Sequence, residues 1–298
     1  MNRPESEAAR GETALFQELR PRLVGVAYGL LGSVSEAEDV VQDAWMRLQR
    51  TDTAAIDDLT GWLVTTTSRL ALDVLRSARV RREAYVGPWL PEPVATAPDP
   101  ADSVSLADSL SWAMLVVLET LSPAERAAFV LHDVFGLTFD EVAAALGRSA
   151  PACRKLASRA RDHVEARKPR FDVDPDEHRH VVEAFSRAVT SGDIDGLTAL
   201  LDPDAVLTSD GGGVVRAARK PVRGAEKVAR FLTGVTARYD DFHHQVTTVN
   251  GGPALLTVTG GEVGGITLLG IADGRIVAVD MVRNPDKLTG IHEVHRPR

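Results

Sequence analysis

The chain has 298 residues, 44% of them hydrophobic and 26% charged, and its formal net charge is -8. This length predicts about two or three domains, each able to bury its own core, and the composition is typical of a soluble globular protein. The acidic net charge excludes nucleic-acid binding by the whole surface, so any contact with DNA has to come from local basic patches.

The single cysteine, Cys153, excludes an internal disulfide framework and fits a reducing compartment. Residues 1–22 are charged and lack an apolar core of signal-peptide length, and no apolar run approaches the length that spans a bilayer. We therefore expect a cytoplasmic protein without a membrane partner.

Two helices are predicted near the N-terminus. Phe16 to Leu31 carries apolar residues at helical spacing and should supply core. Ser33 stands three residues before Glu36, a pattern that caps a helix start, and apolar residues then recur at three- and four-residue steps up to Leu48. The opposite side of this second helix is nearly all acidic, with Glu36, Asp39, Gln42 and Asp43.

A basic helix is predicted after the polar loop Thr51 to Thr60. The periodic run from Trp62 to Glu83 holds five arginines, Arg69, Arg76, Arg79, Arg81 and Arg82. Carboxylates on one helix and guanidinium groups on the next favour an adaptor between a basic protein and nucleic acid. The alternative is that both charged faces are simply solvated.

Several spaced motifs in this part of the chain, at residues 30–33, 37–45, 61–63 and 72–76, occur in one order. Together they resemble conserved region 2 of bacterial sigma factors of the extracytoplasmic-function type. The resemblance implies that the acidic helix docks on the clamp helices of the beta-prime subunit of core RNA polymerase through Asp39, Gln42 and Asp43.

The same resemblance implies contacts with the proximal promoter element. The loop would hold a flipped-out base, and the basic helix would grip the melting duplex through the five arginines. Trp62 is the candidate stacking platform for an unpaired base, although a tryptophan near the start of an amphipathic helix can equally be buried. Arg69 stands where many of these factors carry an asparagine, so their base preference does not transfer to this chain.

A proline-rich linker is predicted at residues 86–108, because closely spaced prolines forbid a continuous helix. The stretch Gly87 to Pro93 is unusually apolar, and its Trp89, Leu90 and Pro91 would lose little conformational entropy on docking. This stretch is a signature of the sigma-factor subgroup that carries a fused SnoaL-like domain.

Residues 109–170 predict a helix-turn-helix domain. Ser122 and Thr138 each precede a glutamate by three residues, and glycines punctuate the turns. The expected helices cover Ser109–Leu121, the run from Pro123 to Phe135, the run from Thr138 to Leu146, and a last helix from Ala150.

The last of these helices is basic. On it, Ala152, Leu156, Ala160 and Val164 repeat every four residues and should face inward. The side chains left to reach a major groove and its phosphates are Arg154, Lys155, Ser158, Arg159 and Arg161. The segment resembles conserved region 4 of the same factors, which reads the distal promoter element and contacts the polymerase flap. The alternative interpretation of residues 109–170 is a four-helix bundle whose last helix is basic. Cys153, on this last helix, is expected to be a half-buried small residue.

The remaining chain, residues 171–298, predicts an α+β domain. Helices are expected at His178–Val189, Asp193–Leu201 and Ala225–Ala237, and strands at Ala205–Thr208, Phe242–Val249, Ala254–Val258, Ile266–Ala272 and Arg275–Val282. The order of elements resembles the SnoaL-like, ketosteroid-isomerase-like cone. The full prediction is two all-α domains, at residues 1–85 and 109–170, followed by this cone.

A cone usually encloses a pocket, so the competing hypothesis is that the C-terminal domain makes the protein an isomerase-like enzyme or a small-molecule sensor. The candidates for a general base are Asp210, His243, His244 and Asp280, which form no recognisable constellation in the sequence. We therefore predict no catalysis, metal or cofactor.

Two further motifs match the SnoaL-fused subgroup: Asp210, Gly211, Gly212 and Gly213, and then Asn284, Pro285, Asp286, Lys287 and Leu288. Val214 replaces the basic residue that usually follows the glycines, and Arg216 is its candidate substitute. The sequence thus predicts an alternative sigma factor that directs core polymerase to promoter DNA. Both motifs would hold the domains or the Trp89–Leu90 tether in place, so that no separate anti-sigma factor is required.

Overall fold

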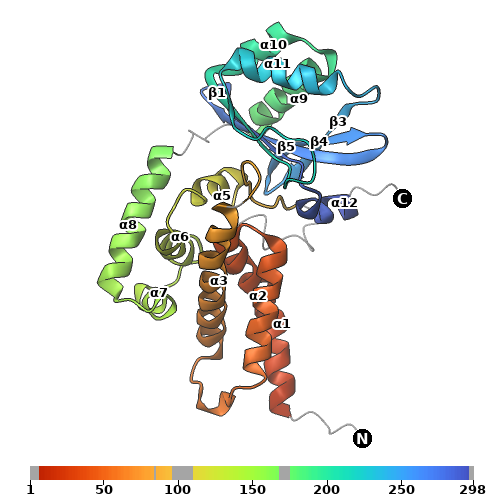
Figure 1. Cartoon of the computed structure of the whole chain (residues 1–298). Coiled ribbons are helices and arrows are strands. Elements are labelled where there is room, and N and C mark those ends of the chain that lie inside the picture. Colours follow the sequence, from red (N-terminus) through yellow and green to blue (C-terminus); the bar gives the residue numbers. More distant parts are fainter. Residues whose placement is uncertain (1–6, 84, 96–109, 168–174, 295–298) are drawn as a thin grey trace, which may run out of the picture. The chain divides into compact units, whose positions relative to one another are not determined.

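The computed structural model describes residues 7–83, 85–95, 110–167 and 175–294, which form two compact units (Figure 1). The first unit holds the described residues within 1–80, 104–110 and 118–165, and the second those within 81–103, 111–117 and 166–298. Within these described ranges, no helix has both the length and the apolar character that crossing a bilayer requires.

The N-terminal part of the first unit consists of helices. They are α1 (Glu7–Leu31), α2 (Val34–Leu48), the short 3-10 helix η1 (Thr53–Ala55) and α3 (Leu59–Glu83). Ser33 caps α2, because its hydroxyl accepts from the Glu36 amide at 3.4 Å, as predicted. In the predicted apolar stripe of α2, Val34 and Trp45 are half-buried, and the buried members are Ala37, Val40, Val41, Ala44 and Leu48.

The basic helix starts earlier than predicted. Asp58 accepts a hydrogen bond from the Gly61 amide at 3.0 Å, which satisfies a free donor of the first turn, so α3 begins at Leu59 rather than at Trp62. The loop that precedes it is also shorter than the expected stretch from Thr51 to Thr60, since η1 occupies three of its residues.

The helix-turn-helix region contains α5 (Trp112–Leu118), α6 (Pro123–Phe129), η2 (Val130–Val134), α7 (Phe139–Leu146) and α8 (Ala150–Arg167). Both predicted capping boxes are present, at the starts of α6 and α7. The helix expected to run to Phe135 changes to a π-helical turn at Val130, closed by a 3.0 Å hydrogen bond from the Phe135 amide to the Val130 carbonyl.

The inward stripe of α8 differs from the prediction. Cys153 and Ala157 are fully buried together with Ala160 and Val164, whereas Ala152 and Leu156 are half-buried. A strict four-residue repeat drifts around an α-helix of 3.6 residues per turn, so alternating four- and three-residue steps follow the core better. Cys153 is therefore a core residue rather than a half-buried one, and burial raises the pKa of its thiol.

The second unit is built on a six-stranded sheet with strand order β2-β1-β6-β5-β4-β3. Its elements are α9 (Pro175–Ser191), α10 (Ile194–Leu200), β1 (Leu201–Asp210), β2 (Val222–Arg223), α11 (Ala225–Thr236), β3 (His243–Val249), β4 (Gly252–Thr259), β5 (Glu262–Ala272), β6 (Arg275–Val282), η3 (Pro285–Lys287) and α12 (Thr289–Val294).

Most of this α+β prediction is confirmed, and the predicted strands Ile266–Ala272 and Arg275–Val282 are joined by an Asp273–Gly274 turn in which both residues have positive φ. The expected meander is present as β3 to β6, but β1 pairs in parallel with β6 and extends to Asp210, beyond the predicted Thr208. This parallel pairing sets Asp210 opposite Val282, next to the chain that continues into η3.

The sheet has an apolar core on each face. Helices α9, α10 and α11 cover one face (Figure 1), where side chains such as Phe185 and Leu269 are buried. On the other face, strand residues such as Leu268 pack with Leu90, Trp112 and Leu288. This second face of the sheet is therefore covered by the proline-rich segment, by α5 and by the motif at residues 284–288. The remainder of the predicted linker, 96–108, lies outside the described residues.

Candidate functional site

The acidic face of α2 is open to solvent. Asp39, Gln42 and Asp43 lie on the side of the helix opposite its buried stripe, and all three are exposed. Within the described residues, neither aspartate has an ion-pair partner. The structure thus brings the three predicted polymerase-contacting residues onto one face, which can accept a basic partner.

The basic helix α3 is engaged within the first unit. Arg69 is exposed, yet its guanidinium group donates two hydrogen bonds, of 3.2 and 2.7 Å, to the Ala144 carbonyl in the last turn of α7. A cation at that position complements the partial negative charge of a helix C-terminus. Arg76 is exposed and pairs with Asp73 at 3.2 Å, and Trp62 is half-buried.

The other three arginines predicted to bind the proximal element belong to the same helix. They are Arg79, Arg81 and Arg82, whose side chains lie outside the described part of the structure.

The predicted groove-reading residues of α8 are all exposed on one side of the helix. Two of them have partners in the first unit. Arg154 lies over the Phe139 ring at 5.3 Å, and Arg161 pairs with Asp133 at 2.6 Å. Lys155, Ser158 and Arg159 complete the exposed basic surface.

A buried carboxylate, that of Asp210, joins the tether to the C-terminal domain. The side chain of Asp210 is 0% exposed and accepts four hydrogen bonds. One oxygen accepts from the Tyr85 hydroxyl at 2.6 Å and the Gly212 amide at 3.0 Å. The other accepts from the Leu90 amide at 2.9 Å and the Lys287 ammonium at 2.7 Å. Of the four donors, Tyr85 directly precedes the linker, Leu90 lies in it, Gly212 follows β1 and Lys287 belongs to η3.

Lys287 completes this cluster from the opposite side. Its ammonium group also donates to the Leu90 carbonyl, and it lies 3.9 Å from the centre of the Trp89 ring. The side chain is only 9% exposed, so its charge is compensated by one carboxylate, one carbonyl and an aromatic face. Burial and the neighbouring Asp210 charge raise the pKa of the Tyr85 hydroxyl, which keeps it a donor.

The glycines after Asp210 permit the close approach. Gly212 has φ +65°, and a Cβ atom there would lie 2.5 Å from Cγ of Asn284. Asn284 in turn donates to the Tyr85 hydroxyl at 3.1 Å and caps η3 through the Asp286 amide. The structure therefore brings the three separate sequence motifs, 89–91, 210–213 and 284–288, into one hydrogen-bonded cluster.

A second buried carboxylate holds the start of α5. The Trp112 ring nitrogen donates to Asp280 on β6 at 2.9 Å, and both side chains are buried. Burial raises the pKa of Asp280 to about 6, while the Trp112 hydrogen bond lowers it.

No catalytic pairing is present among the four candidate bases in the described structure. Asp210 is saturated by its donors, and Asp280 is bonded to Trp112. His243 contacts the Asp241 carbonyl at 3.2 Å, and burial lowers the pKa of His244 to about 4. The described residues also contain no cluster of three groups able to hold a metal ion.

Sequence reasoning missed several members of these contacts. Tyr85 precedes the predicted linker, and its role depends on a partner 125 residues away. Asn250 lies between the predicted strands Phe242–Val249 and Ala254–Val258, yet its buried side chain accepts from the Val94 amide at 3.1 Å. For the Asp280 contact, the signal available in the sequence was Trp112, the one residue with a polar side-chain group at the start of an otherwise apolar helix.

Comparison with known families matches three parts of this chain. Residues 15–81 match the Sigma-70 region 2 family, residues 111–164 match the Sigma-70 region 4 family, and residues 182–279 match the SnoaL-like domain family.

Relatives match nearly the whole length. The chain is 44% identical over 293 residues to the ECF RNA polymerase sigma factor SigJ of Mycobacterium tuberculosis, covering 94% of each chain. It is 36% identical over 285 residues to the probable ECF RNA polymerase sigma factor SigI of the same species, covering 93% of this chain and 94% of SigI. The crystal structure of the M. tuberculosis extracytoplasmic function sigma factor SigJ matches with a TM-score of 0.75 and 40% identity, covering 93% of this chain and 98% of SigJ.

Proposed function

This chain belongs to the extracytoplasmic-function (ECF) RNA polymerase sigma factors, and on that premise we propose which of its surfaces serve each step of transcription initiation. Asp39, Gln42 and Asp43 on α2 would bind the beta-prime clamp helices of core polymerase. The observation that supports this assignment is an exposed helix face on which Asp39 and Asp43 have no ion-pair partner among the described residues.

Promoter DNA would be bound by two separate helices. Trp62 and the arginines of α3 would hold the proximal element, and the exposed side of α8, with Lys155 and Arg159 at its centre, would read the distal element. Weak modules of this kind gain affinity when one polymerase surface holds both. Arg69 would have to exchange the Ala144 carbonyl for a phosphate.

The C-terminal domain would regulate this activity through the tether. Its buried Asp210–Lys287 pair binds the backbone of Leu90 on both sides, at the amide and at the carbonyl, and so fixes the path of the chain between the two DNA-binding modules. No comparison supports the further hypothesis that a separate anti-sigma factor is unnecessary, so it stays a prediction.

Pull-down of core RNA polymerase by the purified full chain tests the docking proposal. Asp39→Arg combined with Asp43→Arg should abolish retention, because two repulsive charges replace two attractive ones. Asp204→Arg combined with Asp240→Arg makes the same change in net charge at two exposed positions of the second unit and should leave retention unchanged. Equal retention of both double variants would refute the assignment of the α2 face. An isomerase or a free-standing sensor would not need this face at all.

Run-off transcription with core polymerase tests the regulatory proposal. Deleting residues 173–298, or cutting before Asn284, should change the yield of promoter-specific transcript. Unchanged yields from both truncated chains, at equal occupancy of core enzyme, would refute regulation by the C-terminal domain.

A further inference from the structure

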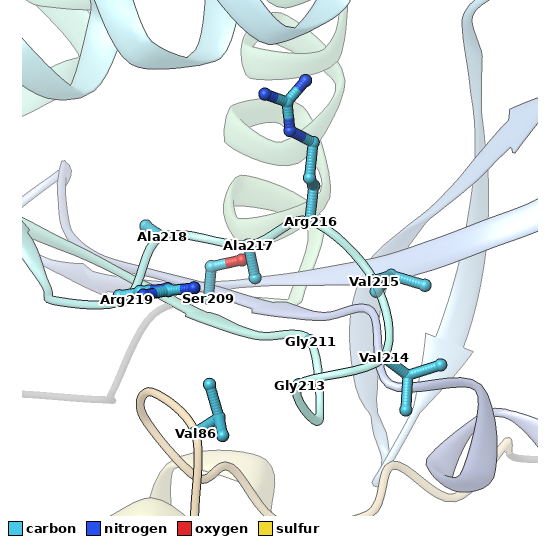
Figure 2. Close-up of a pocket in the computed structure, with 10 residues that line it drawn as sticks. All are labelled: Val86, Ser209, Gly211, Gly213, Val214, Val215, Arg216, Ala217, Ala218 and Arg219. Carbon is cyan, nitrogen blue, oxygen red and sulfur yellow. The ribbon is translucent and has the colours of Figure 1, made fainter.

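A pocket of about 370 Å³ lies at the end of β1, between the tether and the loop that follows Gly213 (Figure 2). Its wall comes from Val86 of the tether, Ser209 of β1 and the loop from Gly211 to Arg219. This volume is in the range that holds a small organic molecule. It is distinct from the Asp210 cluster, whose hydrogen bonds are all made within the protein.

The polar part of the pocket is cationic. Arg219 extends in the direction of Ser209 (Figure 2), which also lines the pocket although it is only 2% exposed. Between Asp210 and Glu226 the chain has no acidic residue and four basic ones, which are Arg216, Arg219, Lys220 and Arg223. All four are exposed, so the local potential favours an anion although the chain as a whole is acidic.

The rest of the pocket is apolar and unusually open. Val214 is 69% exposed and Val86 is 55% exposed, which makes them the two most exposed large hydrophobic residues in the described structure. Val86 packs against Gly213, where a Cβ atom would be only 3.1 Å from the Val86 side chain, and Val214 is the next residue of this loop (Figure 2). An aliphatic group that covered both valines would remove apolar surface from water at the pocket mouth.

We propose that this pocket binds a small organic anion, whose charged head group pairs with Arg219 and the Ser209 hydroxyl and whose short aliphatic tail covers Val86 and Val214. A guanidinium group and a hydroxyl are suited to a carboxylate or a phosphate head group, and the two valines select for a tail of a few carbons. Binding would bridge the tether and the C-terminal domain, since Val86 belongs to the first and the rest of the pocket to the second. Only an effect of such binding on transcription would rest on the proposed regulatory function.

The test is to titrate small-molecule probes into the folded chain and to detect their binding by saturation-transfer NMR. The probes share one six-carbon tail and differ in the head group. Hexanoate and hexyl phosphate should bind saturably, and a preference between them identifies the head group. Hexanol should bind at least about tenfold more weakly than the better anion, because it lacks the charge-assisted hydrogen bonds. Hexylammonium should not bind.

Variants separate the proposed pocket from other sites. Arg219→Gln should weaken binding of the anion by about tenfold or more, and Val214→Asp should abolish it by adding a repulsive charge. Arg187→Gln, which removes an exposed arginine on α9, should bind like the parent chain. Circular dichroism should show each variant to be folded like the parent chain, because none of the three substituted residues is a hydrogen-bond partner of Asp210.

Three results would overturn the proposal. One is the absence of saturable binding by both anions to the folded chain. Another is equal binding of hexylammonium and hexanoate, which would show that charge is not recognised. The third is anion binding that survives both Arg219→Gln and Val214→Asp, which would place the molecule elsewhere on the protein.

Discussion

The buried Asp210–Lys287 ion pair gives the most direct test of how the tether is held. Asp210→Asn keeps the shape of the side chain and removes its charge. Lys287 then remains 9% exposed without the carboxylate at 2.7 Å that compensates it. Removing one partner of a buried pair typically costs about 3–5 kcal/mol, because the other charge stays buried. For a domain of ordinary stability this is about a fifth or more of the free energy of unfolding.

Urea unfolding of the full chain measures the cost, with a separate transition fitted for each compact unit. Asp210→Asn should lower the free energy of unfolding of the second unit by about 3 kcal/mol. The double variant Asp210→Asn with Lys287→Met should recover at least about 2 kcal/mol of the summed single losses, because neither charge is then buried alone. Asp286→Asn, an exposed neighbour of the cluster, should stay within about 0.5 kcal/mol of the parent.

Hydrogen exchange at the Leu90 amide adds a local readout. This amide donates to Asp210 at 2.9 Å, so its protection should fall in Asp210→Asn and be unchanged in Asp286→Asn. The reasoning is refuted if Asp210→Asn is as stable as the parent chain, or if the losses of the two single variants simply add in the double variant.

Three more predictions follow from the burial of single groups. Burial raises the pKa of Asp280 to about 6, so between about pH 4 and 6 the native state keeps a proton that the unfolded chain releases, and stability falls as the pH rises through this window. Asp280→Asn should abolish that dependence and, by urea unfolding at pH 7, be more stable by at most about 3 kcal/mol; an unchanged pH profile would contradict the argument. Gly29→Val should destabilise the first unit by about 1–3 kcal/mol in the same assay, because even a Cβ atom would lie 2.8 Å from Leu110 and 3.0 Å from Val130, and a variant as stable as the parent would disprove this packing. Cys153 should react with a thiol reagent in native buffer at least about tenfold more slowly than in urea, since it is buried and its thiol pKa is raised; equal rates would show that the core opens there.

Local chemistry made much of the fold predictable. Helix starts at Ser33, Ser122 and Thr138 depend on a side chain and an amide three residues apart, which the sequence shows directly. The Asp273–Gly274 turn is equally local, since its residues tolerate positive φ. The SnoaL-like class followed from the order of such elements.

Contacts between distant segments were not predictable in the same way. The parallel pairing of β1 with β6 decides that Asp210 meets Lys287, and no local pattern specifies that pairing. Arg69 was predicted to contact DNA, and its partner within the protein, the Ala144 carbonyl, could not be foreseen because it is a backbone atom 75 residues away. The motifs at 89–91, 210–213 and 284–288 could be singled out one by one, but their common centre, and the part played by Tyr85, required the structure.

The hydrogen bonds that Asp210 and Lys287 make to the Leu90 backbone also limit how the sequences of such chains can change over evolutionary time. A buried aspartate without its lysine, or the lysine without its aspartate, is worse for the fold than neither. Gly212 adds to this constraint, since any side chain there would collide with Asn284. Drift through single substitutions is therefore obstructed, and descendants should inherit the aspartate, glycine and lysine together or discard them together.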